Sequence, residues 1–343
     1  MNRKIVFTMT LMAACIISCL ILTGFTKKPS ETEATAALTA SVTKGFDVLQ
    51  TSGVQFIMNA KCGSCHHSTL TSMIAEKLKA KGLSDRDTTA AMRTGAMNAT
   101  LFFVGNPNLI NQFVPAKFLP AYMLMGLKAE KFPANYNTDL AVDYLISQAL
   151  PDGHFKAEYA RVPFEMGDVH LTATAIYAIQ LYASQAKGKQ VKILVAKTKA
   201  WLEKQQPTNQ QELAFQLLGM KWCGSSETAK NTVAKKLMAL QNNDGGWSQL
   251  PTMQSDAYAT GEALYALSES GMMNIAGDVY TNGTNYLLQT QDATGAWLVN
   301  TRSNPIQPFV NSGFPPLDEN QYISAAATNW ATLALVNALP DKQ

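Results

Sequence analysis

The amino-acid sequence predicts an all-α fold made of repeated helical hairpins, on the basis of three observations. A Gln-x-x-x-Gly-x-Trp motif occurs twice, at Gln241–Trp247 and Gln291–Trp297, with its tryptophans 50 residues apart. Each copy is followed by a block of small and apolar residues at helical spacing. Hydrophobic residues make up 47% of the chain and charged residues only 15%, a composition typical of a well-buried helical protein.

The N-terminus predicts export. Basic residues at Arg3 and Lys4 precede an uncharged, largely apolar run, Ile5–Phe25, which is typical of a signal peptide. The run is also long enough to cross a bilayer uncleaved, and the residues around Cys19 are similar to a lipobox. We therefore predict a signal peptide or membrane anchor over residues 1–28. The protein would be periplasmic, or tethered to the membrane through its N-terminus and facing the periplasm.

Three further segments follow. Residues 29–44 are rich in Ser, Thr, Ala and Glu without apolar periodicity, which predicts a flexible tether. Residues 45–129 are expected to form a helical N-terminal region, and residues 130–340 the repeats. Net charge is only +3 and no helix-like stretch concentrates Lys and Arg, so we expect no nucleic-acid partner.

The predicted unit of the repeat is helix, turn, helix. A degenerate copy of the motif ends at Phe155, 92 residues before Trp247. Small and apolar blocks follow at Thr172–Ile179, Thr260–Leu267 and Thr328–Leu335. Glycine before each aromatic residue is typical of a turn, because it adopts the positive φ that such turns need.

This pattern of Gln-x-x-x-Gly-x-Trp followed by a Thr- and Ala-rich helix resembles the QW motif of squalene-hopene cyclases and of related terpenoid-cyclase and prenyltransferase repeats. The resemblance covers residues 130–340 and implies an α/α toroid, in which inner and outer helices surround a largely apolar cavity. It also implies that the Gln and Trp side chains tie a helix end to its neighbour. The residues given this structural role are Gln241, Gly245, Trp247, Gln291, Gly295 and Trp297.

Cyclase chemistry is not favoured by the sequence. The acidic Asp-x-Asp-Asp motif of such cyclases does not occur in the chain. Asp168 and Asp256 each stand alone before a predicted inner helix, where an Asp is more often an N-cap, and Ser324 occupies the same place in the last copy. Cys223 has no companion His at zinc-ligand spacing, so we expect a buried thiol there.

A Cys-x-x-Cys-His motif lies near the start of the predicted domain, at Cys62, Cys65 and His66. Two thiols one helical turn apart can form thioethers with both haem vinyl groups, and the next residue then offers its imidazole to the iron. The motif predicts covalent haem c, with His66 as the proximal ligand. Upstream, Gly53–Phe56 resembles part of the N-terminal helix of small c-type cytochromes. Two alternatives stay open, a disulfide and a zinc site that adds one or both of His66 and His67.

No clear distal iron ligand follows the motif. Candidates are Met73, Met92, Met97, His154 and His170. Methionine at helical positions is more often core filler, and a histidine in a turn, such as His154, is more often exposed.

Together these patterns predict an exported haem c protein for electron transfer or redox sensing, with an apolar ligand in the toroid cavity. Its partners would be a redox protein or an apolar small molecule. An alternative is a module that binds a lipid or a partner protein, with a structural Cys pair or zinc site. A terpenoid cyclase is a third and less favoured function.

Overall fold

The computed structural model describes residues 30–61, 63–83, 87–102, 117–157, 162–164, 166–303 and 310–341, and the protein is all-helical in these ranges, with turns and loops between the helices. Within these ranges no strand is present, and only an isolated bridge joins Trp247 to Asp256. The predicted signal or anchor segment, residues 1–28, lies outside them. None of the described helices is both long and apolar enough to span a lipid bilayer.

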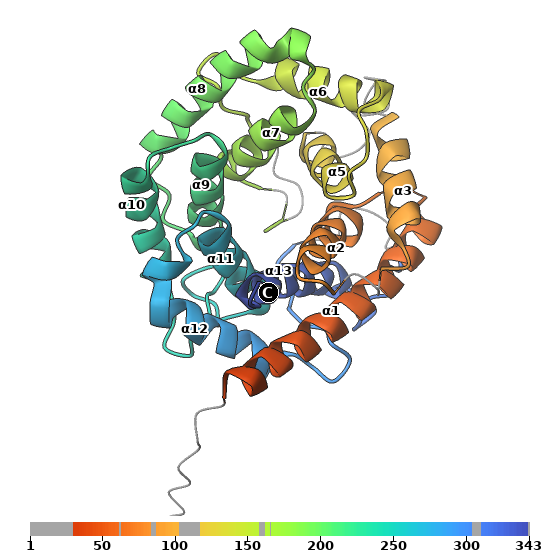
Figure 1. Ribbon diagram of the computed structural model, residues 1–343, viewed down its shortest axis with the longest axis vertical. Helices are drawn as coiled ribbons and strands as arrows, with labels where there is room; N and C mark the ends of the chain where they lie inside the picture. Colours follow the sequence, from red (N-terminus) through yellow and green to blue (C-terminus); the bar gives the residue numbers. More distant parts are fainter. Residues whose placement is uncertain are drawn as a thin grey trace, which may run out of the picture.

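The helices form two concentric layers (Figure 1). The outer layer contains α1 (Glu31–Ala60), α3 (Ala90–Phe102), α6 (Tyr136–Gln148), α8 (Gly188–Lys204), α10 (Glu227–Met238) and α12 (Met273–Thr290). The inner layer contains α2 (Leu70–Ala80), α5 (Phe118–Ala129), α7 (Asp168–Tyr182), α9 (Gln210–Trp222), α11 (Ala257–Glu269) and α13 (Gln321–Ala338). A short π-helix, η1 (Cys65–Thr69), precedes α2, and a 3₁₀ turn, η4 (Gln185–Lys187), precedes α8.

The inner helices close into a ring. Each packs on the next in chain order from α2 to α13, and α13 packs back on α2. Most residues of α5, α7, α9, α11 and α13 are buried on every side. Helices that are apolar all round need neighbours on both sides, which the second layer supplies.

The predicted tether over residues 29–44 is wrong for the part that the structure describes. Helix α1 begins at Glu31, and a reciprocal capping box between Ser30 and Glu33 fixes its start. Leu38 and Val42 are buried in the core. The prediction failed because this stretch is rich in Thr and Ala, which hides its few apolar contacts.

Helices on both sides of the predicted boundary at residues 129 and 130 belong to the same ring. Both α1 and α2, from the N-terminal region, pack on α13 at the C-terminal end of the chain. The start and the end of the sequence therefore stabilise each other.

The two repeat turns have the same hydrogen bonds. Trp247 Nε1 donates to the Leu237 carbonyl and Trp297 Nε1 donates to the Leu287 carbonyl, both at 2.9 Å. Both indoles are buried. Each tryptophan's backbone N–H donates to a threonine of the following inner helix, Trp297 to Thr328 at 3.0 Å. The threonine at the start of each Thr- and Ala-rich block thus anchors the turn to the inner layer.

The repeat glutamines link successive outer helices. Gln241 Nε2 donates to the Gly245 carbonyl in its own turn and to the Val279 carbonyl of α12, both at 2.8 Å. Gln291 Nε2 does the same with Gly295 and with the Ser41 carbonyl of α1, both at 2.9 Å. The second link joins the last outer helix to the first and closes the outer layer.

Close approach explains the glycine of each turn. Gly245 and Gly295 have φ of 87° and 94°. A Cβ at Gly245 would lie 2.7 Å from the Asn282 carbonyl oxygen, and a Cβ at Gly295 would lie 2.6 Å from the Lys44 carbonyl oxygen. Both the backbone conformation and the available space therefore require glycine.

Candidate functional site

The Cys-x-x-Cys-His segment starts directly after α1. Lys61, in the left-handed region with φ of 58°, ends that helix, and Cys62 lies outside the described residues. The Ser64 hydroxyl accepts a hydrogen bond from the His67 backbone N–H at 3.2 Å and caps η1. Helix η1 carries the second cysteine and both histidines. Single π-helical turns are rare and often occur at functional sites.

Aromatic residues from distant parts of the chain surround His66. Its ring centroid lies 5.3 Å from that of Phe164, 5.6 Å from that of Tyr322 on α13, and 6.4 Å from that of Phe56 on α1. Cys65, one residue earlier, is buried. We call His66, His67, Phe56, Phe164 and Tyr322 the aromatic cage. Such rings provide a large apolar contact area for a planar group.

His67 is fully buried in the cage and stacks on Phe56, with ring centroids 4.7 Å apart and an interplanar angle of 9°. Neither of its ring nitrogens has a hydrogen-bond partner among the described residues. Burial lowers the pKa of His67 to about 3, so its imidazole is neutral at pH 7. A buried nitrogen without a partner costs about 1–3 kcal/mol, and a neutral imidazole is a metal ligand.

Among the described residues, no three His, Cys, Asp or Glu side chains are grouped so that they could hold a metal ion. Cys65, His66 and His67 are adjacent in sequence, and the remaining motif residue, Cys62, is outside the described part. A zinc or haem site built on the motif would therefore need Cys62 in addition to Cys65 and His66.

The methionines considered as distal ligands have other surroundings. Met97 is buried, and its sulfur accepts a hydrogen bond from the Thr69 hydroxyl at 3.6 Å. Met73 is buried on α2, whereas Met92 is 39% exposed on α3. Met97 nevertheless lies beside the motif, because a Cβ on Gly63 would meet its backbone at 3.1 Å.

Both histidines considered as distal ligands already have partners. His154 was expected to be exposed, but its ring stacks on Trp201 at 4.8 Å, and its Nδ1 lies 2.6 Å from Asp152. His170 is fully buried, with Nε2 2.7 Å from the Tyr122 hydroxyl. Burial lowers the pKa of His170 to about 3. Neither ring contacts His66, so both suit structural roles.

A chain of buried polar side chains, which the sequence pattern does not predict, crosses the inner ring from α5 to α11. The Tyr122 hydroxyl meets His170, and the other ring nitrogen of His170 lies 3.4 Å from Gln211 Nε2. Gln211 Nε2 also donates to the Pro163 carbonyl at 2.8 Å and to the Tyr258 hydroxyl at 3.2 Å. Four consecutive inner helices are linked in this way.

Glu262 lies on α11 and is fully buried. Gln210 Nε2 donates to its Oε2 at 3.2 Å, while the Glu262 Oε1 and the Gln210 Oε1 have no hydrogen-bond partner within the described part of the chain. Burial raises the pKa of Glu262 to about 8, against the opposing effect of the Gln210 hydrogen bond. At pH 7 this carboxyl group is therefore mostly protonated. A Glu within an apolar, small-residue block was the only available signal for this site.

The lone carboxylates do not all cap helices. Asp256 is the N-cap of α11, as predicted, and accepts from the Ala259 N–H at 2.9 Å. Asp168 instead lies in the first turn of α7 and pairs with Lys156 at 2.9 Å, so that prediction is wrong. Ser324, which was expected at the same place in the last copy, lies inside α13, and its hydroxyl accepts a hydrogen bond from the Val299 backbone N–H at 3.0 Å. These helices start earlier than the periodicity indicated.

Cys223, expected to be a buried thiol, is 7% exposed at the end of α9. Burial raises its pKa to about 12. A thiol with such a pKa is not a nucleophile at neutral pH.

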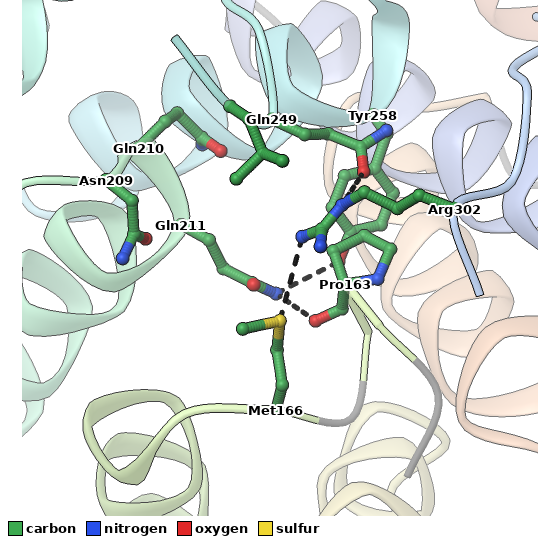
Figure 2. Close-up of a pocket in the computed structure, with 9 residues that line it drawn as sticks. Pro163, Met166, Asn209, Gln210, Gln211, Gln249, Tyr258 and Arg302 are labelled. Atoms are coloured by element: carbon green, nitrogen blue, oxygen red, sulfur yellow. Dashed lines mark hydrogen bonds between the residues drawn. The ribbon is translucent and has the colours of Figure 1, made fainter. Parts of the chain in front are cut away.

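A small pocket opens at the N-terminal end of α9 (Figure 2). Arg302 points into it from the loop before α13, and Arg302 Nε donates to Gln249 Oε1 at 2.9 Å. Gln249 Nε2 in turn donates to Asp256 at 2.9 Å. The other lining residues are Pro163, Met166, Asn209, Gln210, Gln211, Leu250 and Tyr258.

In comparisons with known proteins, the chain matches no protein-family model, and no curated protein is significantly similar to it in sequence. Its function therefore has to be inferred from its own residues and geometry.

Proposed function

We propose that this chain is an exported haem c protein for electron transfer or redox sensing, in which an α/α toroid supports the cofactor. The observation that carries the proposal is the position of the motif. Cys65 and His66 lie on one short turn, and the other rings of the aromatic cage, among them Phe164 and Tyr322, lie around the His66 ring. A c-type haem needs this combination of a thiol, an adjacent imidazole and apolar surroundings.

Cys62 and Cys65 would hold the haem through thioethers, and His66 would bind the iron. The haem iron supplies the one-electron chemistry when it is bound. The chain's own residues would set the environment, because Phe56, Phe164 and Tyr322 lie around the His66 ring, whose two nitrogens are buried. Exclusion of water around an iron site affects its reduction potential.

The ring of helices supports the toroid part of the proposal. In the described chain, α13 packs on α2, and Gln291 links α12 to Ser41 of α1, so both layers close. An apolar small molecule inside the ring and a redox protein outside it are the proposed partners. Export, with cleavage or retention of residues 1–28, would bring the thiols to the compartment where c-type haem is attached.

The proposal is tested by producing the full-length chain with the cytochrome c maturation machinery. We expect a reduced pyridine spectrum with the c-type α-band, and haem staining that survives denaturation. Cys62→Ala should leave at most one thioether, and Cys62→Ala with Cys65→Ala should abolish covalent attachment. His66→Ala should reduce haem incorporation. Cys223→Ala is the matched control and should stain as the parent protein does, because Cys223 is a buried thiol outside the motif.

A metal site in a non-enzymatic binding module is the second candidate. The two ring nitrogens of His67 favour it, because they are buried beside His66 and no described residue forms a hydrogen bond with them. Cys62, Cys65, His66 and His67 would then hold zinc. Stoichiometric zinc in haem-free protein, lost in His67→Ala but retained in His154→Ala, would place this candidate first.

Terpenoid cyclisation stays the third candidate. A cyclase must protonate an alkene and needs an unusually strong acid. Glu262, the buried carboxyl group of the inner ring, has its pKa raised to about 8, which makes it a weaker acid than an ordinary glutamate. We expect squalene to be returned unchanged, and a cyclic product that disappears in Asp256→Asn would promote the cyclase.

A further inference from the structure

We propose that the pocket in Figure 2 binds a carboxylate group, either a small carboxylate ion or the carboxylate end of a larger ligand, with Arg302 as the recognising residue. This site goes beyond the proposed function and does not depend on it. The motif cysteines and the aromatic cage form no part of it.

Among the described residues, the guanidinium of Arg302 has donors without a strong acceptor. Its Nε donates to Gln249 Oε1 at 2.9 Å, and within that part of the chain Nη2 has only the Met166 sulfur as an acceptor, at 3.6 Å. No carboxylate of the described chain forms an ion pair with Arg302. Sulfur is a weak acceptor, and a half-buried guanidinium presents a planar fork that matches a carboxylate with two parallel hydrogen bonds.

The position of the pocket also favours an anion. Asn209, the N-cap of α9, and the first-turn residues Gln210 and Gln211 line it. The N-terminal end of a helix of this length carries a partial positive charge. Arg302 and the N-terminal end of α9 therefore both contribute positive electrostatic potential to the pocket, from two separate parts of the chain.

Nearby acids offset this positive potential only in part. The pKa of Glu262 is raised to about 8, so Glu262 is mostly neutral at pH 7. Burial raises the pKa of Asp256 to about 6, so Asp256 is mostly ionised at pH 7, but Gln249 lies between it and Arg302, and the Asp256 oxygens accept hydrogen bonds from Gln249 and from the Ala259 N–H. Glu212, an acid in the first turn of α9, does not line the pocket.

The size of the pocket selects the ligand. Its volume of about 40 Å³ is three to four times the roughly 10–15 Å³ that one water needs. A carboxylate with its first carbon fits this space. Pro163, Met166 and Leu250 supply apolar contacts for the carbon side of such a group.

Acetate is the probe that tests the site. Full-length Cys62→Ala/Cys65→Ala protein, which cannot attach haem, is titrated with ¹³C-acetate at pH 7 and constant ionic strength, with binding followed by NMR. We expect saturable binding with a dissociation constant on the order of 1 mM. Arg302→Gln should weaken it at least tenfold, and Arg302→Lys should weaken it less. Lys192→Gln, which removes an exposed cation on α8, should leave it unchanged.

Circular dichroism and thermal melting establish that each variant is folded before it is titrated. Absence of saturable acetate binding in the parent, or equal binding in Arg302→Gln and Lys192→Gln, would overturn the proposal. Because haem is excluded from this experiment, its failure leaves the haem proposal unaffected. Titration of haem-loaded protein identifies the source of the carboxylate. If haem-loaded protein no longer binds acetate, a haem propionate occupies the pocket. If it still binds acetate, the pocket serves a separate carboxylate ligand. Both results support the site.

Discussion

The repeat turns and the ring interior differ in how completely their buried polar groups are hydrogen-bonded. At Gln291–Trp297, the glutamine amide, the indole N–H and the tryptophan backbone N–H all have hydrogen-bond partners. In the interior, both ring nitrogens of His67 and one oxygen each of Glu262 and Gln210 have no such partner in the ranges that the structure describes. Buried polar groups normally find partners, and exceptions often mark function. The turns are thus built for stability, whereas the interior keeps groups that could bind something.

Truncation of a repeat tryptophan should have the largest effect on stability. Trp297→Ala removes a buried indole and its hydrogen bond to the Leu287 carbonyl. We expect a loss of about 3–5 kcal/mol in the free energy of unfolding, measured by urea denaturation. Trp247→Ala should give a similar loss because its contacts are the same. A loss under about 1 kcal/mol would mean that the indole is not packed as described.

The glycine of the last turn provides the next test. Gly295→Ala adds a Cβ at positive φ and forces it against the Lys44 backbone. Left-handed strain of roughly 1–2 kcal/mol and overpacking of roughly 1–3 kcal/mol should add. Gly271→Ala is the matched control, because Gly271 has φ of 80° but open space around it. Gly271→Ala should lose only the part of the free energy of unfolding that comes from backbone strain. Equal losses of stability in the two variants would show that this turn is not closely packed against α1.

A pH titration of stability separates the interior from the turns. Glu262 has a folded pKa of about 8, above its ordinary value of 4.5. Its contribution to the free energy of unfolding is therefore fully present below pH 4.5. That contribution is lost as the pH rises from 4.5 through about 8, by an amount on the order of a few kcal/mol. Glu262→Gln should remove this part of the pH dependence. Subtraction of the two profiles cancels other groups, and a flat difference between pH 5 and 8 would show that Glu262 ionises normally.

The smallest expected effect is a gain in stability at His67. Replacement of His67 by Phe in the haem-free Cys62→Ala/Cys65→Ala background removes two unpartnered nitrogens while keeping a ring to stack on Phe56. We expect stabilisation of about 1 kcal/mol, within the range for relieving an unsatisfied buried group. His67→Leu checks for a size effect. Destabilisation by both variants would indicate that the imidazole already has a partner in the folded protein.

The two regions also differ in how far the sequence predicted them. The turns could be predicted because Gln, Gly and Trp each act through local geometry that recurs at a fixed interval. The N-terminal half of α1 could not, because its contacts with the last turn, such as Gln291 to the Ser41 carbonyl, join residues 250 apart in sequence. For the same reason Glu262 and Arg302 were given no role from the sequence, and His170 was considered only as a candidate iron ligand. Their surroundings come from several helices and depend on how the ring closes.

Intact mass of the denatured, matured protein tests the central claim most directly. The proposal predicts the mass of the mature polypeptide plus one haem, retained under denaturing conditions because thioethers through Cys62 and Cys65 are covalent. Protein that was offered haem and the maturation machinery but shows only the polypeptide mass would contradict it. A mass lower by two hydrogens, from a Cys62–Cys65 disulfide, or stoichiometric zinc in the native protein would do the same.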